Sequence, residues 1–340
     1  MKYVRIRSED AAKEIDRLME MDIVDKNAKI RKTETHRLVP ILPGNEDKLK
    51  DCEIIEDIYY SRERKSPQEK ICLALHELPE NIKEMLPMKW EYVGEIAILK
   101  TDIPDEYKSQ IGEVYAEVLG MKTICIDRGV SGEFRRPDME VVFGSDTVSS
   151  RLENGIRYEF DVTKVMYSSG NTDERERMAK LDCSDEVVWD MFAGIGYFSL
   201  PIAKFANPLR VISTEKNPDS YEFLVRNAEL NDVSDVLFPV LGDNRHMHSK
   251  AFADRILMGY VQRTSEFLET ALIAIKDNGI IHYHDTFYVN EYKDKIREIF
   301  DSQPCEYEIL GIKEVKSFAP SVSHYVADVK IKQTPLNRKL

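Results

Sequence analysis

The stretch VVWDMFAGIGYF, residues 187–198, decides the fold of this chain. Its apolar beginning is typical of a buried strand, and its glycines indicate a tight turn that opens a helix. Gly194 can adopt backbone angles closed to other residues, and Gly196 has no Cβ to keep a ligand from the backbone. We interpret the stretch as the first strand and loop of a nucleotide-binding βαβ unit, although Ser199 replaces the third glycine of the dinucleotide fingerprint.

A second strand is expected over residues 211–215, and it ends on Glu215. An acidic residue at this strand tip is placed to accept both hydroxyls of a ribose. Together with the glycine loop it predicts a ligand of the adenosine type. The alternative is a structural glycine turn beside a surface glutamate.

Strands and helices alternate regularly from about residue 161. Further strands are expected over 236–241, 254–260 and 279–285, and residues 323–331 alternate as an antiparallel strand would. We therefore predict an α/β fold with the Rossmann-like open sheet of class I AdoMet-dependent transferases, closed by an antiparallel C-terminal strand. Such sheets bind ligands at the carboxyl ends of their strands.

Two further polar stretches belong to the predicted site. Asp243 and Asn244 follow the third strand and offer an acceptor and an amide for the N6 and N1 edge of adenine. Ser168 and Arg175 lie around a polar loop before a helix and suit the carboxylate of a methionine moiety. For Ser168 and Arg175, helix capping and salt bridges are the alternative roles.

No metal site is expected. His282 and His284 flank Tyr283 on one strand and share a face, but no third ligand is evident, so we interpret them as a satisfied pair at a sheet edge. The five cysteines lie far apart without a CxxC pair, which argues against zinc and against a disulfide framework.

Three domains are expected. Residues 1–58 form a small N-terminal α/β module, residues 62–160 an α+β domain, and residues 161–335 the catalytic sheet. Within the middle domain we expect a helix after the capping box at residues 66–69 and a strand over 90–100. A hairpin is expected around residues 154–155, and a flexible basic loop over 128–137 suits contact with RNA phosphates, with a plain exposed connection as the alternative.

Charge and hydropathy limit the kinds of partner that we expect for this chain. A net charge of −13 disfavours non-specific coating of nucleic acid. It leaves RNA open, because a local basic face acts within a Debye length of about 10 Å. No apolar run approaches the roughly 18 to 20 residues of a membrane helix, and the N-terminus has no signal-peptide core. A cytoplasmic, reduced protein without membrane contact is expected.

Taken together, these motifs resemble those of one known family. Asp190 to Gly196, then residues 215–218 and 242–245, resemble the enzymes that modify position 37 of tRNA. These are the guanosine-37 N1-methyltransferases and the wybutosine-pathway enzymes that transfer a 3-amino-3-carboxypropyl group. Methyltransferases of the family carry Asn-Pro-Pro or Asn-Leu-Pro after strand four, whereas this chain has LMGYV at 257–261. That stretch, residues 168–175 and residues 281–284 resemble the archaeal aminocarboxypropyl branch, while the N-terminal module is similar to the extra domain of archaeal methyltransferases.

The resemblance implies a function. The cofactor is S-adenosyl-L-methionine (AdoMet), the partner is tRNA(Phe) bearing 4-demethylwyosine at position 37, and no DNA partner is expected. C7 of the base would attack the γ-carbon of the methionine chain and release 5′-methylthioadenosine. It implies five cofactor-binding positions, namely Ser168, Arg175, Glu215, Asp243 and Asn244. The catalytic base and the oligomeric state are not assigned, although a monomer is compatible with the sequence, and guanosine-37 N1-methylation is the alternative activity.

Overall fold

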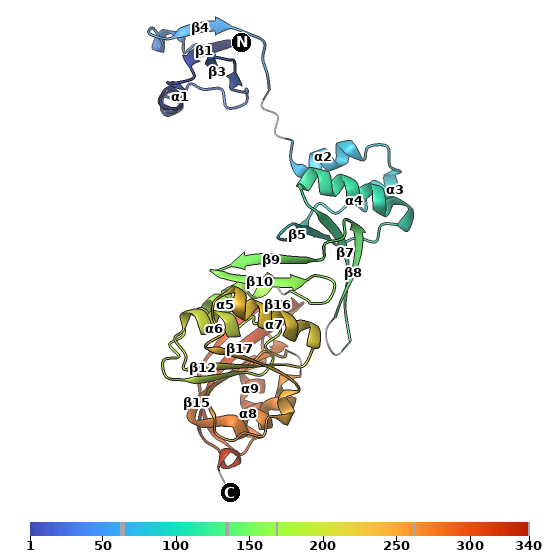
Figure 1. The fold of residues 1–340 in the computed structure, drawn as a ribbon, viewed down its shortest axis with the longest axis vertical. Helices are drawn as coiled ribbons and strands as arrows, with labels where there is room; N and C mark the ends of the chain where they lie inside the picture. The colour runs from blue at the N-terminus through green and yellow to red at the C-terminus, as the bar shows by residue number, and fades with distance from the viewer. Residues whose placement is uncertain (62–64, 133–135, 168, 262, 339–340) are drawn as a thin grey trace. The chain divides into compact units, whose positions relative to one another are not determined.

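The glycine stretch opens from β11 (Val187–Asp190), a strand inside the largest sheet of the computed structural model. The structure describes residues 1–61, 65–132, 136–167, 169–261 and 263–338. Within them the other strands of this sheet are β12 (Arg210–Glu215), β13 (Leu237–Leu241), β14 (Ala253–Met258), β15 (Ile275–Tyr288), β16 (Glu306–Ala319) and β17 (Val322–Gln333). Their order is β13-β12-β11-β14-β15-β17-β16. Figure 1 labels β12, β15, β16 and β17 of this sheet.

Strand direction confirms the predicted fold. Strands β13, β12, β11, β14 and β15 pair in parallel, and β17 runs antiparallel to β15 and to β16. This is the Rossmann-like sheet with an antiparallel C-terminal strand. The long strand β16 and the helix before it (residues 292–301) were not predicted from the sequence. The apolar residues of β16 do not alternate cleanly across its register shifts, whereas those of the helix recur at helical spacing and were overlooked.

Helices cover both faces of the sheet. They are α5 (Thr172–Ala179), α6 (Ser199–Phe205), α7 (Pro218–Leu230), α8 (Leu268–Ala274) and α9 (Tyr292–Asp301). Val188 packs in an apolar cluster with α5, α6 and α7, whereas its neighbour Trp189 packs on the other face with α8 and α9. A strand buried on both faces reads as a continuous apolar run, which is why residues 187–189 identified the fold.

The hairpin of β9 (Val148–Glu153) and β10 (Ile156–Asp161) joins the cluster on the α7 face. Its turn residues Asn154 and Gly155 have φ of +49° and +78°, which confirms the predicted type I′ geometry. Two buried asparagines, one in α7 and one at its C-terminal cap, hold β10 by its backbone. Asn227 accepts from the Glu159 amide (2.7 Å) and donates to the carbonyls of Glu159 and Ile195 (both 3.1 Å).

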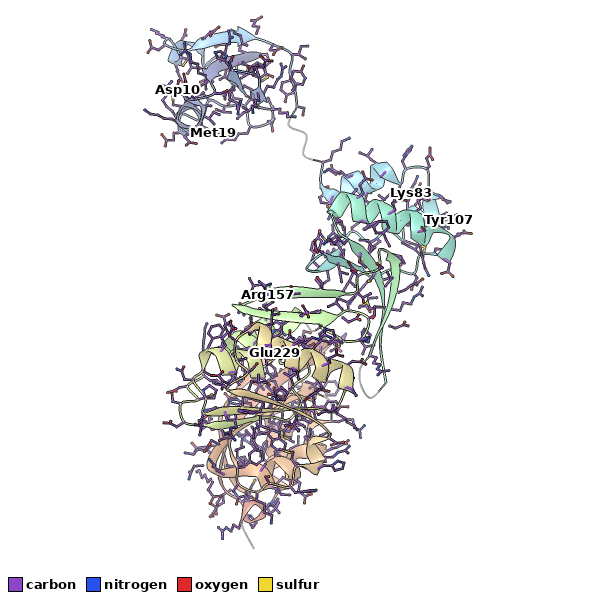
Figure 2. The ribbon with its side chains drawn as sticks, viewed as in Figure 1. Asp10, Met19, Lys83, Tyr107, Arg157 and Glu229 are labelled. Carbon is purple, nitrogen blue, oxygen red and sulfur yellow. The ribbon has the colours of Figure 1, made fainter. Side chains whose placement is uncertain are left out.

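Asn231, one helical turn further on, repeats the contact. It accepts from the amide of Arg157 (2.9 Å) and donates to its carbonyl oxygen (2.7 Å). Figure 2 labels Arg157 on β10 and Glu229 on α7, the two elements that the asparagines join. The two side chains thus act as the neighbouring strand that the outer edge of β10 lacks.

The part before the hairpin is an α+β layer. It contains α3 (Glu80–Lys83), α4 (Asp105–Leu119) and a four-stranded sheet, in the order β5 (Trp90–Val93), β6 (Ile96–Leu99), β7 (Thr123–Ser131) and β8 (Arg136–Phe143), among the described residues. The single strand predicted over 90–100 is wrong, because Gly94 with φ of +53° turns it into a hairpin. The flexible loop predicted over 128–137 is wrong at both ends, which belong to paired strands; its residues 133–135 lie outside the described residues.

The described chain divides into two compact units, Met1–Ala74 and Leu75–Leu340. The first contains a sheet in the order β2 (Arg31–Lys32), β3 (His36–Pro40), β1 (Lys2–Arg7) and β4 (Glu53–Glu56), with the helices α1 (Ala11–Glu20) and α2 (Pro67–Ala74). The capping box before α2 is confirmed, since the Ser66 amide donates to Glu69 at 2.6 Å and the Glu69 amide donates to the Ser66 hydroxyl at 3.2 Å. None of the helices in the described ranges is long and apolar enough to cross a membrane.

We predict that Asn227→Ala lowers the free energy of unfolding by about 2 to 4 kcal/mol, because it leaves buried backbone groups of β10 and of the glycine loop without partners. Chemical denaturation followed by circular dichroism measures the change. Asn290→Ala, at an exposed turn position, is the matched control and should stay within about 0.5 kcal/mol of the wild type. An Asn227→Ala protein as stable as the control would show that the asparagine contacts do not hold the hairpin.

Candidate cofactor-binding pocket

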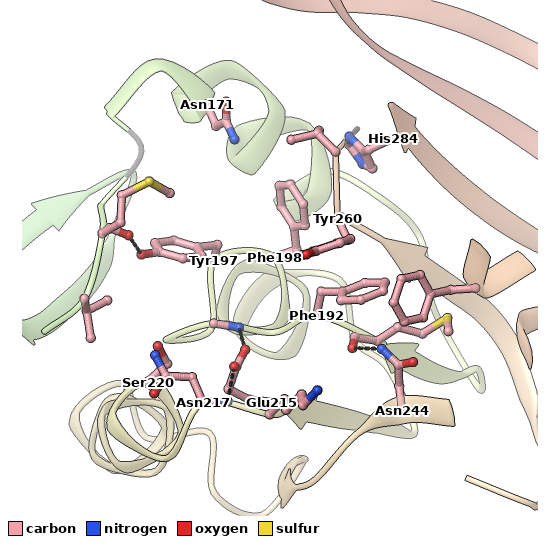
Figure 3. Close-up of a pocket in the computed structure, with 18 of the residues that line it drawn as sticks. Asn171, Phe192, Tyr197, Phe198, Glu215, Asn217, Ser220, Asn244, Tyr260 and His284 are labelled. Atoms are coloured by element: carbon pink, nitrogen blue, oxygen red, sulfur yellow. Dashed lines mark hydrogen bonds between the residues drawn. The ribbon is translucent and has the colours of Figure 1, made fainter. Parts of the chain in front are cut away.

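The main pocket lies where β11, β12 and β14 end, as the sequence predicts for an open α/β sheet (Figure 3). Its walls come from the glycine loop, from the ends of β12 and β14, and from α5, β15, β16 and β17. Of the seven predicted cofactor positions, five line it: Arg175, Gly194, Glu215, Asp243 and Asn244. The structure therefore brings together segments nearly 70 residues apart in the chain.

Glu215 holds the two sides of the pocket floor together. Its carboxylate accepts from the amide of Gly194 at 2.7 Å and from the amide of Asn217 at 2.6 Å (Figure 3). Burial raises the pKa of Glu215, and the backbone amides oppose that rise. Each carboxylate oxygen has a second lone pair, so the group can accept further hydrogen bonds from a diol.

Asn244 presents a buried acceptor to the pocket. Its amide nitrogen donates to the carbonyl of Met191 at 2.7 Å, and its Oδ1 is buried without a hydrogen-bond partner among the described residues. The amide expected to meet adenine is therefore engaged with the backbone, and the free group is an oxygen that suits an amino group such as N6. Asp243 pairs with Arg245 (2.5 Å) and Lys216 (3.3 Å), and the Arg245 hydrogen bond lowers its pKa.

The two glycines of the loop have different roles. Gly194 has φ of +57° and lines the pocket, with its amide on Glu215. Gly196 has φ of +99° and does not line it; a Cβ there would lie 2.6 Å from Leu200 and 3.1 Å from Leu224. Close packing against α6 and α7, rather than approach of a ligand, is what requires this glycine.

Arg175 lines the pocket but already has a partner. Its guanidinium donates to both oxygens of Glu153 on β9, at 2.5 and 3.0 Å, and lies 5.2 Å from the ring centroid of Tyr167. The salt bridge that the sequence left open as an alternative is thus present, and ligand binding by Arg175 stays a prediction. Ser168, the other residue expected at the methionine end, lies outside the described residues.

Sequence reasoning missed several lining residues. Asn171 has a buried Oδ1 without a partner in the described structure, and Lys316 and His324 reach the pocket from β16 and β17. Tyr260, which the sequence placed at the end of the fourth strand, stacks on Phe192 at 5.1 Å, and the two rings give the pocket an aromatic wall. Asn171 lies within a stretch that the sequence singled out, but nothing in the sequence connects Lys316 to a pocket 120 residues away.

The two histidines of β15 are not at a sheet edge, and that prediction is wrong. Strand β15 lies between β14 and β17, and both imidazoles are buried. His282 is satisfied by Asp328 (2.6 Å) and Arg255 (2.9 Å). His284 lines the pocket and shares a 3.1 Å hydrogen bond with His324. Within the described ranges, no three His, Cys, Asp or Glu side chains are grouped so as to hold a metal ion.

Comparison with known proteins adds the family. The profile described as the TRM5/TYW2 methyltransferase domain matches residues 149–310, and the TYW2 N-terminal domain matches residues 72–147. A tRNA(Phe) (4-demethylwyosine(37)-C(7)) aminocarboxypropyltransferase of Pyrococcus horikoshii is 45% identical over 75% of this chain and 93% of its own length. The chain belongs to the TRM5/TYW2 family, on its TYW2 side.

Two other family members bear on the branch. The crystal structure of TYW2 from M. jannaschii in complex with AdoMet is 31% identical, covers 72% of this chain and 99% of that chain, and has a TM-score of 0.58. The tRNA (guanine(37)-N(1))-methyltransferase Trm5b of Pyrococcus abyssi is 31% identical over 93% of this chain and 94% of its own length. The similarity to the methyltransferase covers more of the chain, whereas the sequence identity to the aminocarboxypropyltransferase is higher.

We predict that Glu215→Ala weakens binding of AdoMet by about 1 to 3 kcal/mol, the cost of losing a buried hydrogen-bonding partner. Titration calorimetry on protein with a wild-type circular dichroism spectrum measures it. Glu229→Ala, which removes an exposed carboxylate from the same unit, is the control. Unchanged affinity in a folded Glu215→Ala protein would remove the carboxylate from the ligand site.

Asp190, at the end of β11, gives a pH-dependent prediction. Burial, opposed by the Ser199 hydroxyl that donates at 2.6 Å, raises the pKa of this carboxyl from 3.8 to about 6. The folded protein holds this proton more tightly than the unfolded chain, so the stability that the protonated form adds is complete below about 4 and is lost as the pH rises through 6.

Ionisation of this carboxyl should lower the free energy of unfolding of the wild type by roughly 3 kcal/mol between pH 4 and pH 7. Asp190→Asn should abolish that part of the decrease. Urea denaturation across this range measures the difference between variant and wild type. Asp235→Asn, at an exposed position, should leave the pH profile as it is. Parallel profiles for Asp190→Asn and wild type would contradict the raised pKa.

Proposed function

We propose that this chain transfers the 3-amino-3-carboxypropyl group of AdoMet to C7 of 4-demethylwyosine at position 37 of tRNA(Phe) and releases 5′-methylthioadenosine. The observation that carries the proposal is the 45% identity to an aminocarboxypropyltransferase over 93% of that enzyme. The chain is an AdoMet-dependent transferase, and tRNA is its substrate. Specificity for tRNA(Phe) is the finer part of the proposal.

The pocket fits AdoMet by its unsatisfied groups. Two buried side-chain oxygens at its walls, Oδ1 of Asn244 and Oδ1 of Asn171, lack partners among the described residues, and such atoms are costly unless a ligand donates to them. Glu215 would hold the ribose, and Asn244 would accept from the adenine amino group. Arg175, Asn171 and the predicted Ser168 would hold the amino acid end. Gly194 would let the ribose approach the loop, while Gly196 acts through packing.

Transfer of the larger group depends on how the pocket orients AdoMet relative to the base. AdoMet supplies a sulfonium whose three carbons are electrophilic, and in-line displacement needs the nucleophile opposite the sulfur. The residues that fix the amino acid end decide which carbon faces the base. Gly259 and Tyr260 line this pocket at the end of β14. By the family resemblance, the methyltransferases carry Asn-Pro-Pro or Asn-Leu-Pro at this place. The chain has neither asparagine nor proline there to shape a guanine site.

We also propose roles for the remaining regions and for the setting. Residues 1–58 and 62–160 would contact tRNA, and residues 161–335 would carry the reaction. Charge alone does not reveal these contacts, since the chain carries a net charge of −13. The protein would work in the cytoplasm, without a membrane or DNA partner.

Transfer of label from AdoMet to tRNA tests the proposed function. Purified protein is incubated with tRNA(Phe) bearing 4-demethylwyosine and with AdoMet labelled in the carboxyl or in the methyl group. We expect carboxyl label, and no methyl label, in the tRNA. A transcript with unmodified guanosine 37 is the control and should take up neither label. Methyl label in that transcript would instead support guanosine-37 N1-methylation, to which the likeness to Trm5b over 93% of the chain points.

A further inference from the structure

Two histidines at one side of the pocket form a hydrogen-bonded pair that the function proposed above does not use. Nδ1 of His284 and Nε2 of His324 are 3.1 Å apart. His284 is fully buried in the middle of the sheet, whereas His324 is 4% exposed, and both line the pocket. Figure 3 shows His284 across the pocket from Glu215, with Phe198 and Tyr260 between them. The pair therefore lies away from the predicted ribose site.

The surroundings of His284 fix the direction of the hydrogen bond. Its Nε2 is buried without a hydrogen bond and lies 3.7 Å from Oε1 of Glu174, which Arg177 holds at 2.6 Å. A ring nitrogen that faces a carboxylate carries the proton, because its lone pair would be repelled there. His284 then accepts at Nδ1, so His324 donates from Nε2. This leaves Nδ1 of His324 as a bare lone pair, with no hydrogen bond from any described residue.

We propose that His324 is the catalytic base that removes the C7 proton, with His284 and Glu174 as positioning residues. The inference rests on the proposed function, which requires this proton to leave as the new C–C bond forms. Nδ1 of His324 takes the proton of C7. The C7–Cγ bond forms while the Cγ–S bond breaks, and its electron pair leaves with the sulfur of 5′-methylthioadenosine. One positive charge moves from the sulfonium to the imidazole, so charge is conserved.

A neutral imidazole is the form that the site favours. Burial, together with the smaller effect of the nearby Lys316, lowers the pKa of His324 from 6.5 to about 4. Burial also lowers the pKa of His284, and its neighbours His324, His282 and Arg177 add to that effect, against Asp328. An uncharged base can therefore share the pocket with a sulfonium. Loss of the proton from the tetrahedral C7 restores the aromatic ring, and this driving force lets a base with a lowered pKa accept the proton.

Glu174 would stabilise the product of proton transfer. When His324 becomes charged, its Nε2–H still donates to His284, whose Nε2–H faces the Glu174 carboxylate. Arg177 joins that carboxylate to Asp328, at 2.8 Å from the latter, and Asp328 accepts from His282. These contacts fix the ring orientations of His284 and, through it, of His324, much as a buried carboxylate orients a catalytic histidine.

His324→Gln is the test, because the glutamine amide can still bond to His284 but cannot take a proton. We expect kcat for aminocarboxypropyl transfer to fall by about 10²- to 10⁴-fold. Affinity for AdoMet, measured by calorimetry, should stay within about twofold of the wild type. With tRNA deuterated at C7, the variant should show a larger primary isotope effect than the wild type, since proton removal becomes rate-limiting. His76→Gln, at an exposed position of the same unit, should change none of these quantities.

The tautomer gives a readout without the reaction. Nitrogen-15 spectra of the histidine rings in the free enzyme should show a proton on Nε2 and none on Nδ1 of His324. A protonated Nδ1, or a His324→Gln enzyme with wild-type kcat and isotope effect, would overturn the assignment. If the wild-type enzyme transfers no carboxyl label to tRNA, the proposed function fails instead, and the two failures are thereby distinguished.

Discussion

The hydrogen bonds from Asn227 and Asn231 to the backbone of β10 are the constraint on which the site depends. They give the outer edge of a two-stranded hairpin a partner, and a hairpin alone is marginally stable in water. With β10 fixed to α7, β9 is fixed as well, and β9 carries Glu153, the partner of the buried Arg175. Asn227 also donates to Ile195 in the glycine loop. One helix thus sets the positions of two pocket walls.

Charged side chains line both sides of the pocket, and on the ribose side the cations Lys216 and Arg245 are paired with Asp243. At the ribose side lie Glu215 and, behind the loop, Asp190, both carboxyls whose pKa burial raises. At the other side lie Arg175, Lys316 and the two uncharged imidazoles. An acidic side suits hydroxyl and amino donors, and a side with cations suits a carboxylate. The sulfonium between them then needs no counter-ion in contact, since a polar, preorganised site can hold it.

The sequence predicted most where a residue type has a single physical reason. The apolar run before Asp190, the left-handed Gly194 and the acid at Glu215 gave the sheet and one side of the pocket. The other side was not predictable, because His324 and Lys316 enter it through strand pairing that no local pattern announces. Gly94 shows a similar limit, since one glycine divided an apolar strand into two. Asn244 lines the pocket, but which of its two ends is free depends on Met191, a contact set by folding.

The pairing of Arg175 with Glu153 has a consequence for how the catalytic sheet can be used. The arginine is 2% exposed, and its charge is balanced by a residue that precedes the sheet by more than thirty positions. A shortened chain that began after the hairpin would lose the carboxylate that pairs with this guanidinium, and removing one partner of a buried ion pair costs several kcal/mol. The minimal catalytic fragment therefore starts before β9, and excision of the Rossmann-like portion by itself would yield a misfolded product rather than a small transferase.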